Sequence, residues 1–332
     1  MRYWGSLASR RRGAIFQPGR ALRSALVALA LAALLPMSAL AADPIEDTST
    51  FGTGIAVDPI APDNSSVPPA YLKEKNRQLK DFVKTGAHPP RPVKHGAAAP
   101  QLDVLPMSGT GVPAQAYLTW YPGFHQKTGY YCLIATVQSI AYFDLEPLWY
   151  RTLGSGSIRG AQDKLYYGYY DPDGTWNPAL WVGGATNSGA SDAKAVVWIN
   201  RQFSSYGYGW YYAVARRPSS TEELMTYIRF DVGVSAEPTY IRGDLSVPEY
   251  PWRQAAVKVN GKWVHALHAT LAVGYRDSDG VVRSYDPFTS PKSDGRCQKG
   301  PFQGPDFACS WNMLADNYYD AVDKNVANPI WW

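Results

Sequence analysis

Apolar residues recur at helical spacing through the first part of the region that follows residue 113. They form one helical face between Leu133 and Phe143, and the stretch from Ser191 to Phe203 has a similar pattern. Ser220 and Glu223 form a capping box that predicts the start of a third helix, and Gly233 is expected to end it. The sequence therefore predicts helices in this part of the chain.

Apolar and polar positions alternate further along the chain, which is typical of strands. The alternation from His268 to Tyr275 is followed by a turn at Asp277–Gly280 and a second apolar stretch from Val281 to Tyr285, which together predict a hairpin. Val234 to Ile241 predicts a further strand. Helices followed by strands favour an α+β domain, which we place at residues 114–332, long enough for one sizeable core.

The first 41 residues have the pattern of an export signal. Arginines precede the apolar run Ala25 to Leu35, which is shorter than the roughly 20 residues that a membrane span needs. Small residues at Ala39 and Ala41 predict cleavage after Ala41, although Ser9-Arg10-Arg11 leaves both the general secretory and the twin-arginine route open. We expect a secreted or periplasmic protein with no stable membrane insertion after signal removal.

Residues 42–113 are rich in proline and alanine and show no sustained apolar period. Such a composition predicts a disordered tail or a pro-segment, because too little apolar surface is available to offset the entropy of ordering. One island within it, Leu72 to Val83, predicts a short amphipathic helix.

Composition and charge limit the classes of partner. Of the 332 residues, 45% are hydrophobic and 18% charged, which is typical of a folded soluble chain. The formal net charge of +4 includes six arginines before Ala42, so the remainder carries −2. Because bulk positive charge is missing there, we expect no nucleic-acid partner. We also expect a monomer.

Three cysteines, Cys132, Cys297 and Cys309, remain in the expected mature chain. Cys297 and Cys309 flank one loop rich in glycine and proline, so in an oxidising compartment they are the natural disulfide pair. Cys132 then stays free. No spacing of histidines and cysteines suggests zinc, and the Asp171–Gly174 segment lacks the later ligands of a calcium loop, so we expect no metal and no cofactor.

Cys132 lies where the first predicted helix begins, a position that favours the thiolate. Gln126, six residues earlier, could help the backbone N–H of Cys132 hold an oxyanion. If the hairpin turn centres on Ser278, His268 and Asp286 share one face, and the carboxylate can fix the tautomer of the imidazole. His265 competes with His268 for the role of base.

These residues resemble a known family. Gln126-x5-Cys132 followed by a helix, and His268 to Tyr275 followed by Asp286-Pro287, are similar to the bacterial cysteine peptidases of family C thirty-nine, and most of all to the exported "C thirty-nine-like" branch. The resemblance implies a papain-like fold and a peptide or protein substrate. It also implies Cys132 as nucleophile, His268 as base, Asp286 as its orienting carboxylate and Gln126 in the oxyanion hole.

The sequence thus predicts an exported cysteine peptidase that hydrolyses peptide bonds through a thioester. The family usually has Gly-Pro directly after the nucleophile, where this chain has Leu133-Ile134. That departure keeps a second hypothesis open, an inactive peptide- or glycan-binding module on the same fold, in which Tyr166 to Tyr170 could line a groove. A third, an acyl transferase, would use the same three residues.

Overall fold

The structure is a computed structural model. It describes residues 61–86, 102–104, 112–118, 121–128, 130–145, 148–182, 189–205, 212–244, 258–259, 262–263, 267–287, 309–323, 326 and 328–332. All of them belong to one compact unit, Ile45–Trp332. The expected signal segment, residues 1–41, lies outside the described residues.

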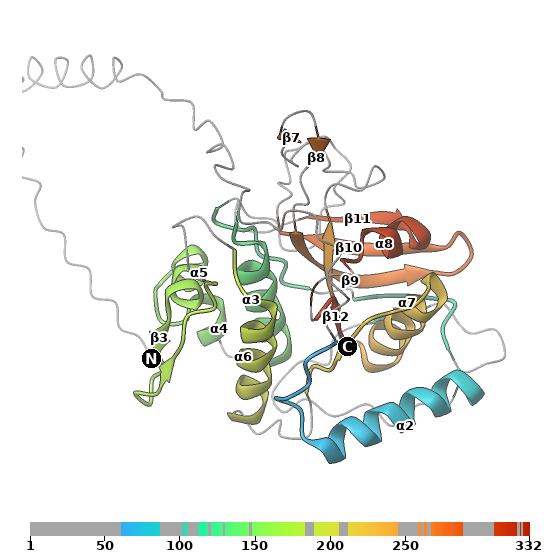
Figure 1. Cartoon of the computed structure of the whole chain (residues 1–332), viewed down its shortest axis with the longest axis horizontal. Coiled ribbons are helices and arrows are strands. Elements are labelled where there is room, and N and C mark those ends of the chain that lie inside the picture. Colours follow the sequence, from blue (N-terminus) through green and yellow to red (C-terminus); the bar gives the residue numbers. More distant parts are fainter. Residues whose placement is uncertain are drawn as a thin grey trace, which may run out of the picture. The chain divides into compact units, whose positions relative to one another are not determined.

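Helices and antiparallel strands build this unit (Figure 1). The helices are α2 (Pro69–Thr85), α3 (Cys132–Leu145), α4 (Leu148–Thr152), α5 (Ile158–Tyr167), α6 (Asp192–Ser205), α7 (Thr221–Ile228), the π-helix η2 (Arg229–Ser235) and α8 (Ala315–Ala321). The strands are β1 (Leu102–Val104), β2 (Gln115–Leu118), β3 (Tyr169–Tyr170), β4 (Trp176–Asn177), β5 (Ala215–Arg216), β6 (Thr239–Asp244), β7 (Lys258–Val259), β8 (Lys262–Trp263), β9 (Leu267–Arg276), β10 (Val281–Asp286), β11 (Cys309–Leu314) and β12 (Ile330–Trp331).

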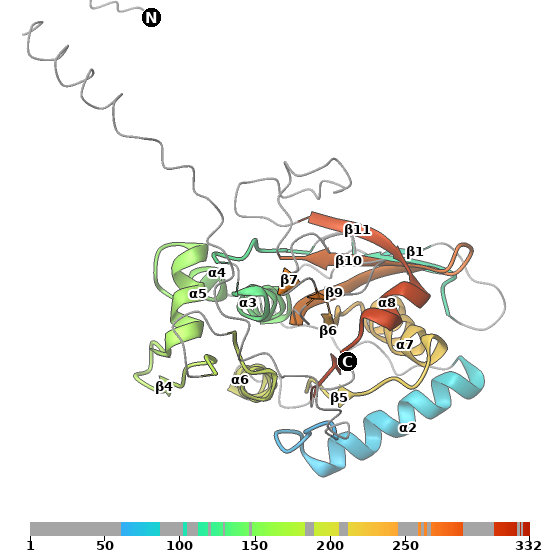
Figure 2. The same ribbon diagram turned by 45° about the horizontal axis from the view of Figure 1, so that its top comes forward.

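Helices α3 to α6 gather on one side of the unit, and the main sheet with α7 and α8 lies on the other (Figures 1 and 2). The helix α3 packs against both α6 and β9, and its side chains are buried on nearly all sides. A helix that is apolar all round has to be covered on every face, which explains why α3 lies between the two groups. The predicted helices at Leu133–Phe143 and Ser191–Phe203 are confirmed as α3 and α6.

The main sheet is antiparallel, and β9 is its central strand. One edge of β9 pairs with β6 along its first half and with β2 along its second, while β10 pairs with the other edge and carries β11. Every residue of β9 except its two ends is buried. The expected α+β arrangement is confirmed, with Cys132 in the helical part and His268 and Asp286 on the sheet that follows.

The predicted hairpin is β9 and β10, and it contains a bulge. Next to the turn Val281 pairs with Arg276, one position away from the register expected from the sequence. The pairing then shifts between Arg283 and Ser284, because β9 has one extra residue, Val273, between their two partners. Beyond the bulge Tyr285 lies opposite Leu271, which restores the expected register near Asp286.

The predicted end of the third helix was wrong. Ser220 caps α7 as expected by accepting a hydrogen bond from the backbone N–H of Glu223, but the helical path continues through Gly233 as η2. A Cβ at Gly233 would lie 2.4 Å from the hydroxyl oxygen of Tyr275, so glycine is needed there for a close approach. The strand expected at Val234–Ile241 consequently begins later, as β6.

The expectation of a disordered tail does not hold for residues 61–86. There α2 begins with proline at its first turn, which a helix tolerates, and Phe82 is buried in the core of the domain. The apolar face expected between Leu72 and Val83 is mostly right, because Leu72 and Leu79 also pack against that core, whereas Val83 is 66% exposed. The ordered domain therefore includes chain that precedes residue 114.

Candidate active site

Cys132 is the first residue of α3, and only 7% of it is exposed. The helix is held against β9 near this residue, because Thr136, one turn further along, donates a hydrogen bond to the backbone oxygen of Ala269 at 3.3 Å. The thiol therefore lies where the helix start meets the central strand. The unpaired backbone N–H groups of a first helical turn favour an anion at such a place.

His268 and Asp286 lie together on neighbouring strands. The ring Nε2 of His268 donates a hydrogen bond to Oδ1 of Asp286 at 2.7 Å, and the two residues are 3% and 0% exposed. This bond leaves Nδ1 for the other side of the ring, where the side chain of His268 forms a hydrogen bond with the Cys132 thiol. The structure thus brings Cys132, His268 and Asp286 into one chain of contacts.

The protonation of this chain favours an ion pair. Burial alone would lower the pKa of His268, but the charge and hydrogen bond of Asp286, together with Cys132, raise it to about 10. Burial alone would raise the pKa of the Cys132 thiol, but the hydrogen bond and charge of His268 and the charge of Arg242 outweigh burial and lower it. Both shifts favour a thiolate beside an imidazolium.

Gln126 is 3% exposed and is tied to the strand end that carries Asp286. Its backbone N–H donates to the oxygen of Pro287 at 2.8 Å, so the loop before α3 runs beside the end of β10. One side-chain N–H donates to the backbone oxygen of Thr128 at 2.6 Å, and Oε1 has no hydrogen-bond partner. An amide nitrogen has two hydrogens, so the second has no partner among the described residues.

Gln162 on α5 holds the backbone on both sides of Gln126. Its Oε1 accepts from the N–H of Lys127 at 2.7 Å, and its Nε2 donates to the oxygen of His125 at 3.0 Å. The side chain is fully buried. Nothing in the sequence pattern singled out Gln162, because its contacts join residues that lie about 36 positions apart along the chain.

Leu133 and Ile134, which stand where the resembling family has Gly-Pro, are both fully buried. Both belong to the main core cluster of the domain. Their bulk therefore contributes to packing under the helix start and is not presented to solvent beside Cys132.

Several sequence expectations fall outside the described residues. His265 and Cys297 lie there, and of Cys309 only the backbone, in β11, is described, so the expected disulfide stays a prediction. Among the described residues no group of three or more potential metal ligands comes together. Asp171–Gly174 forms the tight turn between β3 and β4, with the N–H of Gly174 donating to the oxygen of Asp171.

None of the helices in the described part of the chain is long and apolar enough to cross a membrane.

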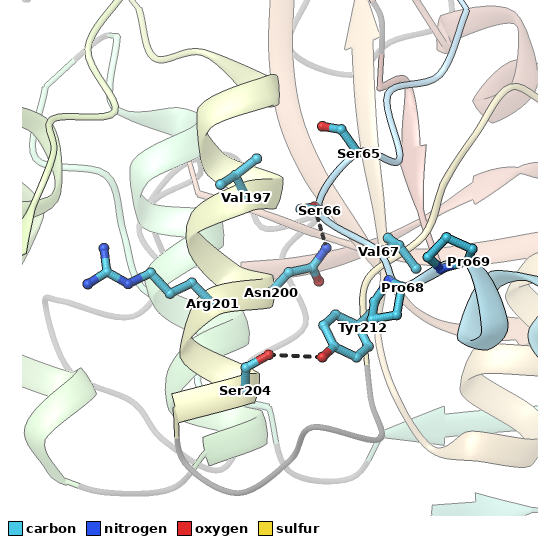
Figure 3. Close-up of a pocket in the computed structure, with 10 residues that line it drawn as sticks. All are labelled: Ser65, Ser66, Val67, Pro68, Pro69, Val197, Asn200, Arg201, Ser204 and Tyr212. Carbon is cyan, nitrogen blue, oxygen red and sulfur yellow. Dashed lines mark hydrogen bonds between the residues drawn. The ribbon is translucent and has the colours of Figure 1, made fainter.

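A hollow of about 390 Å³ lies between residues 65–69 and α6 (Figure 3). Within it Asn200 donates to the hydroxyl of Ser66, and Ser204 donates to the hydroxyl of Tyr212. None of the lining residues belongs to the group around Cys132. The hollow is therefore separate from the residues around Cys132, which remain the candidate site.

Comparisons with known proteins add little to this geometry. No protein-family model matches the sequence, and none of the curated proteins does. One solved structure to which the chain is similar is xylellain, a cysteine protease from Xylella fastidiosa. The two share 14% identity with a TM-score of 0.31, over 73% of this chain and 94% of xylellain. A TM-score this low does not establish a shared fold.

Proposed function

We propose that this protein is a cysteine peptidase of the papain-like type, which hydrolyses peptide bonds through a thioester at Cys132. The observation that carries the proposal is the contact chain from the Cys132 thiol through His268 to Asp286, joined by the 2.7 Å bond between Nε2 and Oδ1. A nucleophile, a base and a carboxylate that orients the base are the parts that thiol acyl chemistry requires.

The reaction would proceed in two stages. The Cys132 thiolate attacks the substrate carbonyl carbon, and the resulting oxyanion is held by the backbone N–H of Cys132 and the remaining side-chain N–H of Gln126. The C–N bond breaks as His268 donates its proton to the leaving amine, which gives a thioester. His268 then takes a proton from water as the water oxygen attacks the thioester carbonyl carbon. The C–S bond breaks, which releases the acid and restores the Cys132 thiolate beside the His268 imidazolium.

The compartment forms part of the proposal. The apolar run that precedes Ala41 supports export to a secreted or periplasmic location, and an oxidising compartment would allow Cys297 and Cys309 to pair. Cys132, which the structure shows unpaired, would then be the thiol left for chemistry.

The test is incubation of the purified chain with a diverse peptide library, followed by mass spectrometry of the products. We expect cleavage by the wild-type protein and none by Cys132→Ala, whose smaller side chain removes the sulfur and leaves the fold in place. Circular dichroism of both proteins controls for folding.

Three outcomes would contradict the proposal. Absence of cleavage by both proteins would favour a binding module, and ligated products without hydrolysis would indicate an acyl transferase. Equal cleavage by both proteins would show that Cys132 is not the nucleophile.

A further inference from the structure

Arg242 lies on β6 beside the residues that meet Cys132. It pairs across the sheet with Ala269, and the next residue, Gly243, pairs with His268. The backbone oxygen of Ala269 also accepts the hydrogen bond from Thr136, one turn into α3. Arg242 therefore lies on the strand next to the point where α3 meets β9.

The guanidinium of Arg242 is buried, and its hydrogen bond to the side chain of Tyr240 satisfies only part of it. The residue is 5% exposed, and its Nε and Nη1 have no hydrogen-bond partner. It forms an ion pair with Asp192, the first residue of α6, whose Oδ2 lies 3.7 Å from Nε. The other oxygen of Asp192 accepts a hydrogen bond from the hydroxyl of Tyr240.

Such an arrangement is costly for stability alone. Removing a guanidinium from water is compensated only when its N–H groups find good partners, and here two nitrogens do not. The Asp192 carboxylate, 3.7 Å from Nε, offsets part of this charge, and the remainder is felt by neighbouring groups because buried surroundings screen it weakly. Cys132 is one of the groups on which this charge acts, together with Asp192 and Tyr240, and the charge favours the thiolate form of Cys132.

We propose that Arg242 is a positioning residue for the nucleophile. The buried charge of Arg242 stabilises the Cys132 thiolate beside the His268 imidazolium. The inference rests on the proposed peptidase function and assigns that site a second source of positive charge. The charged and titratable groups around Cys132 are then His268 on β9 with Asp286 behind it on β10, Arg242 and Tyr240 on β6, and Asp192 on α6.

The test measures the rate at which iodoacetamide alkylates Cys132 as a function of pH, by mass spectrometry of the full chain. Arg242→Met removes the charge with most of the bulk kept, and we expect alkylation at pH 6 to slow by about tenfold, because less thiolate is present. Arg242→Lys keeps the charge, so its pH profile should stay near that of the wild-type protein.

Asp192→Asn is the matched control, because it acts on the same cluster with the opposite sign. Loss of the carboxylate leaves Arg242 without its counter-charge, so alkylation at pH 6 should be as fast as in the wild-type protein or faster. A merely structural role would slow alkylation in both Arg242→Met and Asp192→Asn, and that result would overturn the inference. If Arg242→Met does not fold, slower alkylation of Asp192→Asn alone is sufficient to overturn it.

The outcome for the wild-type protein separates this inference from the proposed function. A Cys132 that reacts only after denaturation overturns both. A wild-type thiol that reacts readily at pH 6, with an unchanged profile in Arg242→Met, leaves the peptidase proposal in place and overturns the role of Arg242.

Discussion

His268 holds its proton far above the pH at which a free imidazole loses it, and Asp286 is the main favourable cause. The pKa of His268 is raised from 6.5 to about 10, with the Asp286 charge outweighing the opposing effect of burial. A group whose pKa is higher in the folded state stabilises that state below its unfolded pKa, and this contribution is lost as the pH rises through the folded pKa. The contribution of protonated His268 to the stability of the fold is therefore lost between about pH 6.5 and pH 10.

Asp286→Asn should remove most of this dependence. We expect the free energy of unfolding of the variant to lie furthest below that of its parent at pH 6, and the gap to narrow towards pH 10. Urea unfolding at both values measures it, with Cys132→Ala as the parent so that the thiol does not titrate. A gap that stays constant between pH 6 and pH 10 would show that Asp286 does not raise the pKa of His268.

Replacement of Gln162 should lower the rate of catalysis more than the loss of folding stability alone would. Gln162→Leu leaves the N–H of Lys127 and the oxygen of His125 without their partner, which costs about 1–3 kcal/mol of stability. It also frees the backbone around Gln126, so we expect slower peptide cleavage, with the loss in kcat and not in KM alone.

Gln138 offers a matched control for Gln162. It is a buried glutamine on α3 whose Nε2 donates to the backbone oxygens of Arg151 and Ile158, away from the Gln126 loop. Gln138→Leu should lose comparable stability by urea unfolding and keep its kcat. Equal losses of kcat in the two variants would attribute the effect of Gln162 to general destabilisation.

Local pattern explains which of these residues the sequence could reveal. His268 and Asp286 were predicted as neighbours because strand alternation and a short turn decide which side chains share a face. Gln162, Arg242 and Asp192 reach the site only when α5, β6 and α6 pack around α3, and no local period marks such contacts. Their types are also common on surfaces, so composition does not single them out.

At the scale of elements, the bulge in the β9–β10 hairpin joins the register of the turn to the different register of the strand ends that carry the site. The turn begins one position away from the register that puts His268 and Asp286 on one face, and the extra residue Val273 corrects it. The regular hairpin predicted from the sequence has the right pairing near Asp286, although it lacks the bulge. Bulges leave only a weak local signal, which here is Gly274, where a Cβ would lie 2.2 Å from the Tyr117 ring.

Deletion of Val273 should remove the bulge without separating His268 from Asp286. The residues on both sides of the bulge keep their partners in the regular hairpin that results, so the two side chains stay on one face. An alanine inserted next to Val273 lengthens β9 alone and moves His268 out of line with Asp286. We expect alkylation of Cys132 near neutral pH to stay close to the wild-type rate in the deletion variant and to slow by about tenfold or more in the insertion variant, because the imidazolium no longer supports the thiolate there. Equal rates in the two variants would mean that the register of this hairpin does not set the site.

At the scale of the whole described unit, residues 61–86 tie together parts that are distant in sequence. The N–H of Asp63 donates to the side chain of Asn328, and Asn64 exchanges two hydrogen bonds with the backbone of Ala215. Further along, Lys75 lies over the ring of Trp332 at 4.5 Å from its centroid. Proline content was a poor guide here, since it indicates disorder only where no apolar stripe is available for burial.

Phe82 allows a direct test of whether residues 61–86 are part of the folded domain. Its ring packs edge-on against Phe230 at 5.2 Å between centroids and is 5% exposed, while the neighbouring Val83 is 66% exposed. We expect Phe82→Ala to lower the free energy of unfolding of the whole domain by about 3–5 kcal/mol, because it opens a cavity in the shared core. Val83→Ala should change it by less than about 0.5 kcal/mol. If urea unfolding gave the same small change for both variants, residues 61–86 would be an appendage that folds or detaches without affecting the domain that holds Cys132.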